Sequence, residues 1–340
     1  MSAYAKILVG VHGSPTSEVA EETAARLAAQ LGAELTLIHV SDDEATTQGS
    51  GAEILAAAVE RARAHGIEPG SELRSGEVAP TIMAAAAELR SDLLVIGDHG
   101  MESASPFTLG GIPGQVAHHT PVDILVVRTG RPGTGPHTYG RVLIGTDGSL
   151  TAHQATRHGH ALAQSLGADI GLIFVGDPLI GDIVLRDTAA RLGGDEIEQI
   201  VVKGNPAAQI SKAATDFDLV VVGNKGMTGS RRYIQRVVPN RVAHDAPTDV
   251  LIAKTVGRAF FDLRPGEGAV VEVAGEKVAA YLHDDGTTFM LSARCQHMGC
   301  IVGWNGRART WDCPCHGSRY EYDGALINGP ATRPLPPVQT

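Results

Sequence analysis

CQHMGCIVGWNGRARTWDCPCHGSRY, residues 295–320, contains all four cysteines of the chain. They lie in two short loops, CQHMGC at 295–300 and CPCHGS at 313–318, and each loop also carries one histidine, His297 or His316. Two cysteines and two histidines are ligands either for a tetrahedral zinc ion or for a 2Fe-2S cluster with imidazoles on one iron. Four cysteines alone are also compatible with two disulfides.

The order of the ligands separates these alternatives. A zinc finger keeps its cysteines as one pair and its histidines as another, and a zinc ribbon needs Cys-x-x-Cys knuckles, which are absent here. Each loop instead supplies one of each kind, as Cys-x-His, fifteen residues, then Cys-x-x-His. Two plain disulfides would leave both histidines without a role. This interleaved order resembles that of the Rieske family.

The resemblance implies a role for each residue. In Rieske proteins the first Cys of each loop binds one iron and the His of each loop binds the other. The implied ligands here are Cys295, His297, Cys313 and His316. Cys300 and Cys315 stand where one Rieske subclass joins its loops by a disulfide. A reducing cytosol favours free thiols at these two positions, whereas burial under the loops would protect a bridge.

Three further positions match the environment of the cluster in high-potential Rieske proteins. Ser318 and Tyr320 match hydroxyls that donate hydrogen bonds to a bridging sulfide and to a ligand thiolate. Gly329-Pro330-Ala331 matches the proline loop that covers the cluster. Neutral imidazoles and hydroxyl donors both favour the reduced state, so the resemblance implies a reduction potential on the order of +100 to +300 mV.

Composition sets the limits for the rest of the chain. Its 340 residues allow two or three domains, and 43% of them are hydrophobic. The formal net charge of -10 argues against nucleic acid or an anionic membrane as the principal partner. No apolar run is long enough to cross a membrane, and the start MSAYAKILVG lacks the features of an export signal. We therefore expect a cytoplasmic protein.

An internal repeat occupies the residues before 255. Residues 6–14 recur at 141–149 and residues 31–40 at 166–175, with a spacing of 135. Residues 92–101 recur at 218–227 and residues 120–125 at 246–251, with a spacing of 126. The second copy is therefore nine residues shorter in its middle. Such self-similarity indicates two copies of one structural unit.

Short apolar runs alternate with alanine-rich stretches in each copy. In the first copy the runs 7–11, 35–40, 93–96 and 124–127 predict buried strands, and 18–31, 52–65 and 80–89 predict helices. This alternation predicts a doubly wound parallel sheet with helices on both faces and ligands beyond the carboxyl ends of the strands. After residue 261, short alternating strands and the turn signals Asp284-Asp-Gly286 and Asp323-Gly324 predict a small all-β domain.

The repeated segments resemble the universal stress protein domain. The markers are the opening ILVGVxGS, the LGAxLxLIHV strand, and VIGxxGM followed by a Pro-x-x-[VI]-L-[VI] strand. We therefore predict three domains. They are two universal-stress-protein-like α/β domains at 1–132 and 137–256 and a Rieske domain at 262–340.

Nucleotide-binding members of that family use an Asp after the first strand and a Gly-x-x-Gly, nine residues, Gly-[Ser/Thr] segment around the phosphates. Each copy retains only part of this pattern. The retained candidates are Gly97, Gly100 and Gly110 in the first copy, and Asp147, Gly223 and Gly226 in the second. The departures are His12 for the Asp and Gly111 for the hydroxyl residue in the first copy, and Arg236 and Val237 for Gly-Ser in the second. Two interpretations stay open: domains retained for dimer-like packing, or a degenerate site for ATP or another adenine nucleotide.

The function implied by these resemblances is one-electron transfer or redox sensing by a Rieske cluster carried on a stress-protein scaffold. The alternatives are a nucleotide-binding stress regulator with the cluster as its redox input, or a ferredoxin-like electron donor. We expect a separate redox partner, such as a flavoenzyme or an oxygenase component, and the packing interpretation also allows a homodimer. No catalytic residue is predicted, because neither a Ser-His-Asp set nor paired catalytic carboxylates emerge. The chain is therefore expected to be an oxidoreductase component and not a catalyst by itself.

Overall fold

The structure is a computed structural model that describes residues 3–41, 50–98, 122–129, 137–194, 197–224, 238–254, 263, 265–273, 276–285 and 287–338. The chain divides into two compact units, Met1–Thr255 and Val256–Thr340. We call the first the repeat unit and the second the β unit. Each is described by itself below.

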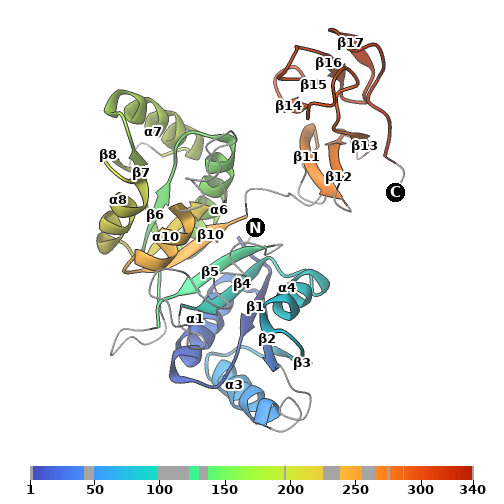
Figure 1. Ribbon diagram of the computed structural model, residues 1–340. Coiled ribbons are helices and arrows are strands. Elements are labelled where there is room, and N and C mark those ends of the chain that lie inside the picture. Colours follow the sequence, from blue (N-terminus) through green and yellow to red (C-terminus); the bar gives the residue numbers. More distant parts are fainter. Residues whose placement is uncertain are drawn as a thin grey trace. The chain divides into compact units, whose positions relative to one another are not determined.

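Both copies of the sequence repeat contain five strands in the repeat unit (Figure 1). The first copy comprises β1 (Lys6–Gly10), α1 (Pro15–Leu31), β2 (Glu34–Ser41), α3 (Ala52–Ala64), β3 (Gly70–Ser75), α4 (Val78–Glu88), β4 (Leu93–Gly97) and β5 (Asp123–Val127). The second comprises β6 (Arg141–Gly145), α6 (Leu150–Leu166), β7 (Asp169–Val175), α7 (Pro178–Leu192), β8 (Glu198–Val202), α8 (Pro206–Ala213), η2 (Ala214–Asp216), β9 (Leu219–Gly223), α10 (Val238–Asp245) and β10 (Asp249–Ala253).

All ten strands belong to one sheet, in the order β3-β2-β1-β4-β5-β10-β9-β6-β7-β8. The strands of each copy pair in parallel, which confirms the predicted doubly wound fold. The two copies meet at β5 and β10, which pair antiparallel with Leu125 opposite Leu251. The sequence analysis did not predict this antiparallel junction, which makes the two sheets one.

The repeated sequence motifs set the ends of the first helix in each copy. Ser14 and Ser149 cap α1 and α6 by accepting hydrogen bonds from backbone N–H groups of the first turn. Gly32 and Gly167 end the same helices in the left-handed conformation, at φ values of 64° and 66°. The Gly-Ser and Leu-Gly-Ala motifs therefore specify where each helix begins and ends.

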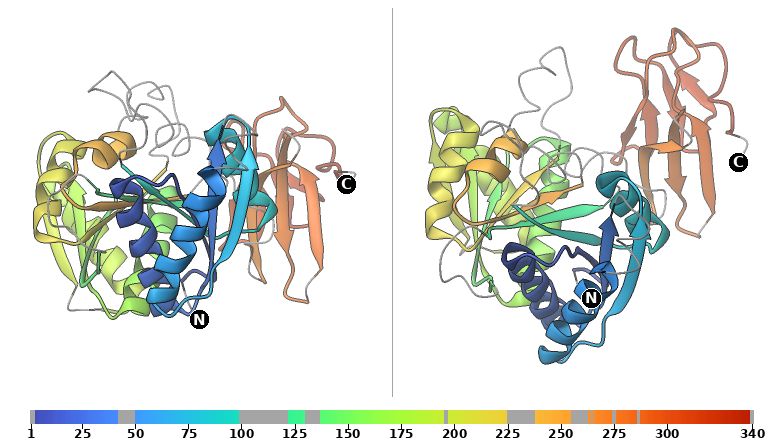
Figure 2. Two further views of the ribbon diagram at one scale, coloured as in Figure 1. Left: turned by 90° about the horizontal axis from the view of Figure 1, so that it is seen from below. Right: turned by 60° about the horizontal axis from the view of Figure 1, so that its bottom comes forward.

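Helices cover both faces of the sheet (Figure 2). Buried side chains of α1, α3, α6 and α7 form one apolar core with the sheet, and those of α4, α8 and α10 form the other. The predicted strands and helices of the first copy lie within three residues of the observed bounds. β3 was not predicted, because it is an edge strand whose residues are at most partly buried and lack a continuous apolar run.

Two buried carboxylates bind the copies together at the junction. Asp123, at the start of β5, accepts hydrogen bonds from Tyr4 Oη at 2.7 Å, from His158 Nδ1 at 2.6 Å and from the Lys254 N–H at 2.7 Å. The His158 and Lys254 donors come from the second copy. Each oxygen of the carboxylate is thereby engaged, so this buried charge is compensated.

Asp249, at the start of β10, is held by similar donors, of which only the Arg128 N–H comes from the first copy. It accepts hydrogen bonds from Tyr139 Oη at 2.6 Å, from His137 Nδ1 at 2.7 Å and from the Arg128 N–H at 2.8 Å. Arg128 follows β5, just as Lys254 follows β10. The two backbone contacts, from Lys254 to Asp123 and from Arg128 to Asp249, are thus exchanged between the copies, with the equivalent residues 126 positions apart.

The β unit contains two small antiparallel sheets. The three-stranded sheet consists of β11 (Glu267–Val273), β12 (Glu276–Leu282) and β13 (Thr288–Ser292), and the four-stranded sheet of β14 (Gly303–Asn305), β15 (Thr310–Asp312), β16 (Arg319–Glu321) and β17 (Leu326–Asn328). A turn that begins at Asp284 joins β12 to β13, and one at Asp323-Gly324 joins β16 to β17, as predicted. Gly286 lies outside the described residues. Among the helices described, none has the length and apolar character needed to span a bilayer.

Candidate metal centre

Two loops of the β unit carry the predicted ligands, and their backbones are alike. Loop 1 runs between β13 and β14, and loop 2 between β15 and β16. In loop 1 the Cys295 N–H donates to Cys300 O at 2.8 Å, and the Gly299 N–H donates to Cys295 O at 2.9 Å. Gly299 has a φ of 73°, a conformation that favours glycine.

Loop 2 repeats each of these features eighteen residues later. The Cys313 N–H donates to Ser318 O at 2.7 Å, the Gly317 N–H donates to Cys313 O at 3.1 Å, and the φ of Gly317 is 75°. The first cysteine of each loop therefore occupies an equivalent, tightly turned position. Two equivalent turns are a suitable frame for two equivalent pairs of ligands.

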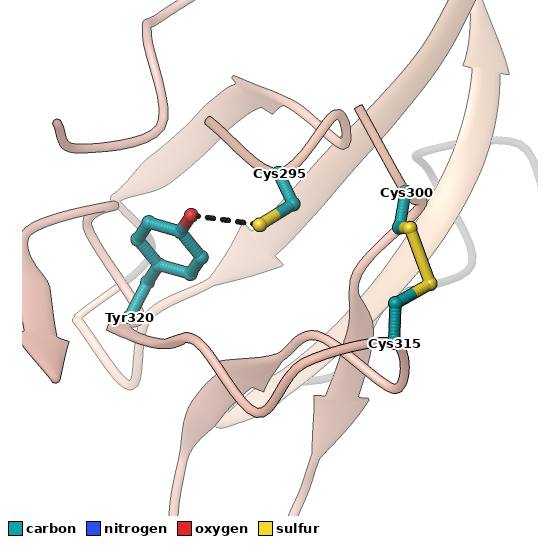
Figure 3. The surroundings of a disulfide bond; sticks show 4 residues. All are labelled: Cys295, Cys300, Cys315 and Tyr320. Atoms are coloured by element: carbon teal, nitrogen blue, oxygen red, sulfur yellow. Dashed lines mark hydrogen bonds between the residues drawn. A yellow bond between two sulfur atoms is a disulfide. The ribbon is translucent and has the colours of Figure 1, made fainter. Parts of the chain in front are cut away.

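A disulfide between Cys300 and Cys315 joins the two loops (Figure 3). It confirms the predicted bridge, and the two Cα atoms lie 6.6 Å apart. The sulfur of Cys313 lies within 4.8 Å of both disulfide sulfurs. Because the bridged cysteines have no thiolate to offer, Cys295 and Cys313 are the two cysteines left for metal binding.

The two kinds of candidate ligand differ in solvent exposure. Cys295 and Cys313 are only 2% and 3% exposed, whereas His297 and His316 are exposed. The two imidazole rings lie with their centroids 4.8 Å apart and their planes perpendicular. The predicted ligands are thus two buried thiols and two exposed imidazoles whose rings contact each other.

Tyr320 contacts the buried side of this set, with its Oη 3.1 Å from Cys295 Sγ (Figure 3). Because the same oxygen accepts a hydrogen bond from the Gln296 N–H at 3.2 Å, its own hydrogen is available to the sulfur. Burial opposes ionisation of the thiol, but hydrogen bonds, of which the one from Tyr320 is the largest, leave the pKa of Cys295 below its usual value. Burial and the bond to Cys295 raise the pKa of Tyr320 to about 12, so the phenol remains a donor at neutral pH.

Residues 329–331 pack against loop 2. The Ala331 N–H donates to the Oγ of Ser318, a fully buried residue, at 3.1 Å. Gly329 has a φ of 110°, and a Cβ added there would collide with the Ser318 Cα. Glycine is therefore required for this close approach. Pro330, at the centre of the segment, is exposed.

The donor set fits a 2Fe-2S cluster of the Rieske type. Two buried thiols, one with a lowered pKa, supply the soft anionic ligands, and two imidazoles supply neutral ones. A hydroxyl already directed at a ligand sulfur is a typical outer partner of such a centre.

The sequence analysis did not single out three exposed apolar residues of this unit: Met298, Ile301 and Ile327, exposed by 68%, 37% and 41%. Nothing in their sequence pattern marked them as exposed.

The candidate nucleotide-binding residues are only partly described. Asp147 follows β6 and Gly223 ends β9, a neighbouring strand, so both lie at the same edge of the sheet. Asp147 is exposed, and its Oδ1 accepts a hydrogen bond from the Ser149 N–H at 2.9 Å. In the first copy Gly97 ends β4, beside β1. Gly100, Gly110 and Gly226, together with the departures Gly111, Arg236 and Val237, lie outside the described residues.

Models of known protein families match segments of both units. The model of the universal stress protein family matches residues 3–128 and 181–254, and that of the Rieske 2Fe-2S domain matches residues 258–339. The structure adds β6, α6 and β7, which lie between the two matched segments of the first model and complete the second copy.

Two relatives are similar to different shares of the chain. A universal stress protein of Mycolicibacterium smegmatis is 28% identical over 286 residues, which cover 73% of this chain and 96% of that protein. The Rieske 2Fe-2S iron-sulfur protein YhfW of Bacillus subtilis is 43% identical over 76 residues, which cover 22% of this chain but only 15% of that protein.

A solved structure supports the fold of the repeat unit. The crystal structure of a universal stress protein from Archaeoglobus fulgidus superposes with a TM-score of 0.61 at 19% identity, covering 75% of this chain and 97% of that one. At this level of identity the similarity concerns the fold alone.

Proposed function

Because the chain belongs to the universal stress protein family and ends in a Rieske 2Fe-2S domain, we propose that it is a stress-related redox protein which exchanges single electrons with a separate partner. One observation carries this proposal. The four candidate ligands lie in two disulfide-joined loops, with the thiols buried and the imidazoles exposed. A centre held in this way would present its exposed imidazoles to a partner.

The residues around such a centre would have different roles. A bound 2Fe-2S cluster would supply a one-electron redox couple, with Cys295, Cys313, His297 and His316 as its ligands. Because both cysteines are buried, their sulfurs are shielded from water. Tyr320 lies within hydrogen-bond distance of the Cys295 sulfur, and its hydroxyl would stabilise the more negative state of a bound cluster and so raise its reduction potential.

The test is the EPR spectrum and iron content of the full chain purified without oxygen. We expect a Rieske-type signal on reduction, two irons per chain in keeping with a 2Fe-2S centre, and a midpoint potential on the order of +100 to +300 mV. The variant His297→Leu should lose both signal and iron. His283→Leu is the matched control, because His283 lies in the same unit and pairs with Asp285 instead. If His297→Leu retains its iron and colour, the assignment is wrong.

A second candidate function is regulation by an adenine nucleotide. The observation that favours it is the position of Asp147 beside Gly223 at the carboxyl ends of β6 and β9, where ligands bind in this type of sheet. Calorimetry with ATP on oxidised and reduced protein tests it, with Asp147→Ala as the variant that should lose binding. Negligible heat in both redox states would remove this candidate.

A further inference from the structure

Met298 stands apart from the other methionines that the structure describes. It lies in loop 1, directly after His297, and 68% of its surface is exposed. Met83 and Met290, by contrast, are partly buried and pack against apolar cores. A thioether reacts with peroxides in proportion to its accessibility, so the three residues should differ in rate.

We propose that Met298 is a peroxide-modification site, which records oxidative exposure as methionine sulfoxide on the same loop that holds His297. The oxidant is a peroxide, with hydrogen peroxide as the simplest member of the class. The sulfur attacks one peroxide oxygen, the O–O bond breaks, and an S=O bond forms while the second oxygen leaves as water. Sulfur loses two electrons and the peroxide gains them, so no further reactant is needed.

Oxidation would change the apolar surface of the β unit. Ile301, which follows Cys300, and Ile327, in β17, are also exposed apolar residues of this unit. A sulfoxide converts the most exposed of these three side chains from apolar to polar. The loop itself is held by the disulfide and by its internal backbone hydrogen bonds, so the modification alters the surface without requiring the loop to unfold.

The oxidation of methionine to its sulfoxide is also reversible. Its sulfoxide is reduced back by methionine sulfoxide reductases, whereas the higher oxidation states of cysteine are largely irreversible. Both free cysteines of the chain, Cys295 and Cys313, are buried. In this loop the exposed thioether is therefore more accessible to a peroxide than the ligand thiols.

The experiment follows oxidation of each methionine in the full chain after addition of hydrogen peroxide, by peptide mass spectrometry over time. Met298 should form sulfoxide at least about threefold faster than Met290 and Met83, in keeping with its accessibility. Met298→Leu should remove the fast phase, and Met290→Leu, the matched control in the same unit, should leave it unchanged. Subsequent treatment with methionine sulfoxide reductases and a thiol should restore Met298.

Equal rates at Met298 and Met290 would overturn the proposal, as would a fast phase that persists in Met298→Leu. This readout needs no electron-transfer activity. A failure here therefore leaves the cluster assignment standing, and a protein without iron would still give a result for Met298.

Discussion

The repeat unit and the β unit are stabilised in different ways. The repeat unit has two extensive apolar cores, one on each face of a ten-stranded sheet, and its junction is closed by buried Asp123 and Asp249. The β unit has one small main core, to which the ligand cysteines themselves belong, and a disulfide between its loops. A small domain buries a smaller fraction of its surface, so it depends more on covalent or metal cross-links.

The two units can be followed separately in one sample. Both tryptophans, Trp304 and Trp311, lie in the β unit, where their ring centroids are 4.8 Å apart. Every helix that the structure describes lies in the repeat unit. Tryptophan fluorescence therefore reports unfolding of the β unit, and the helical circular dichroism signal reports unfolding of the repeat unit.

The largest effect is expected from Asp249→Ala in the repeat unit. The Asp249 side chain is fully buried, and its removal leaves three donors without their acceptor. We expect a loss of about 3–5 kcal/mol in the free energy of unfolding, because each buried donor that loses its acceptor costs about 1–3 kcal/mol. Urea unfolding followed by circular dichroism measures it.

Two comparisons sharpen this result. Asp123→Ala should cost a similar amount, because Asp123 is also buried and also accepts hydrogen bonds from a tyrosine, a histidine and a backbone N–H. Asp187→Ala, which removes an exposed partner of Arg191, should cost less than about 1 kcal/mol. A midpoint for Asp249→Ala equal to that of Asp187→Ala would refute a role for the junction carboxylates.

Removal of the disulfide should affect only the β unit. The bridge spans fifteen residues, and closing a loop of this length constrains the unfolded chain by about 3 kcal/mol. Metal-free Cys300→Ala/Cys315→Ala protein should therefore lose about this much stability by fluorescence, with an unchanged circular dichroism transition. Equal shifts in both signals would show that the two units unfold as one.

The sequence revealed those features that depend on local pattern. The apolar runs and alanine-rich stretches predicted β1, β2, β4 and β5 with the helices between them, because burial imposes a period that is readable in sequence. The interleaved Cys and His spacing also indicated the ligand loops, and the resemblance to the Rieske family implied the bridge between Cys300 and Cys315 that the structure contains.

The remaining features depend on contacts between distant residues. His158 and Asp123 are 35 residues apart, and Tyr139 and Asp249 are 110 apart. No local sequence pattern therefore indicates these hydrogen-bonded pairs. The repeated Pro-x-Asp motif was their one signal, and it was recognised only as part of the repeat. Burial of the cysteines and exposure of the histidines likewise follow from the packing of loops 1 and 2, which spacing alone does not specify.

A smaller effect is expected from Gly329→Ala in the β unit. The added Cβ would collide with the Ser318 backbone, and φ of 110° is itself unfavourable for alanine. We expect a loss of about 1–3 kcal/mol by fluorescence, the usual cost of holding such a backbone conformation. Gly303→Ala is the matched control, because no atom lies within 4 Å of its added Cβ. Equal stability of the two variants would show that segment 329–331 does not pack on loop 2.

The smallest effect is a dependence on pH in the repeat unit. Burial, followed by the neighbouring Asp249 carboxylate, raises the pKa of Tyr139 well above its usual value near 10. The folded protein therefore retains a proton that the unfolded chain releases, and the stability from this group is complete below pH 10 and is lost as pH rises further, by about 1.4 kcal/mol per pH unit. Tyr139→Phe should flatten the decline of the circular dichroism midpoint above pH 10 relative to the unmodified protein. Identical slopes for the two proteins would mean that Tyr139 ionises as readily folded as unfolded, and that its contact with Asp249 does not form.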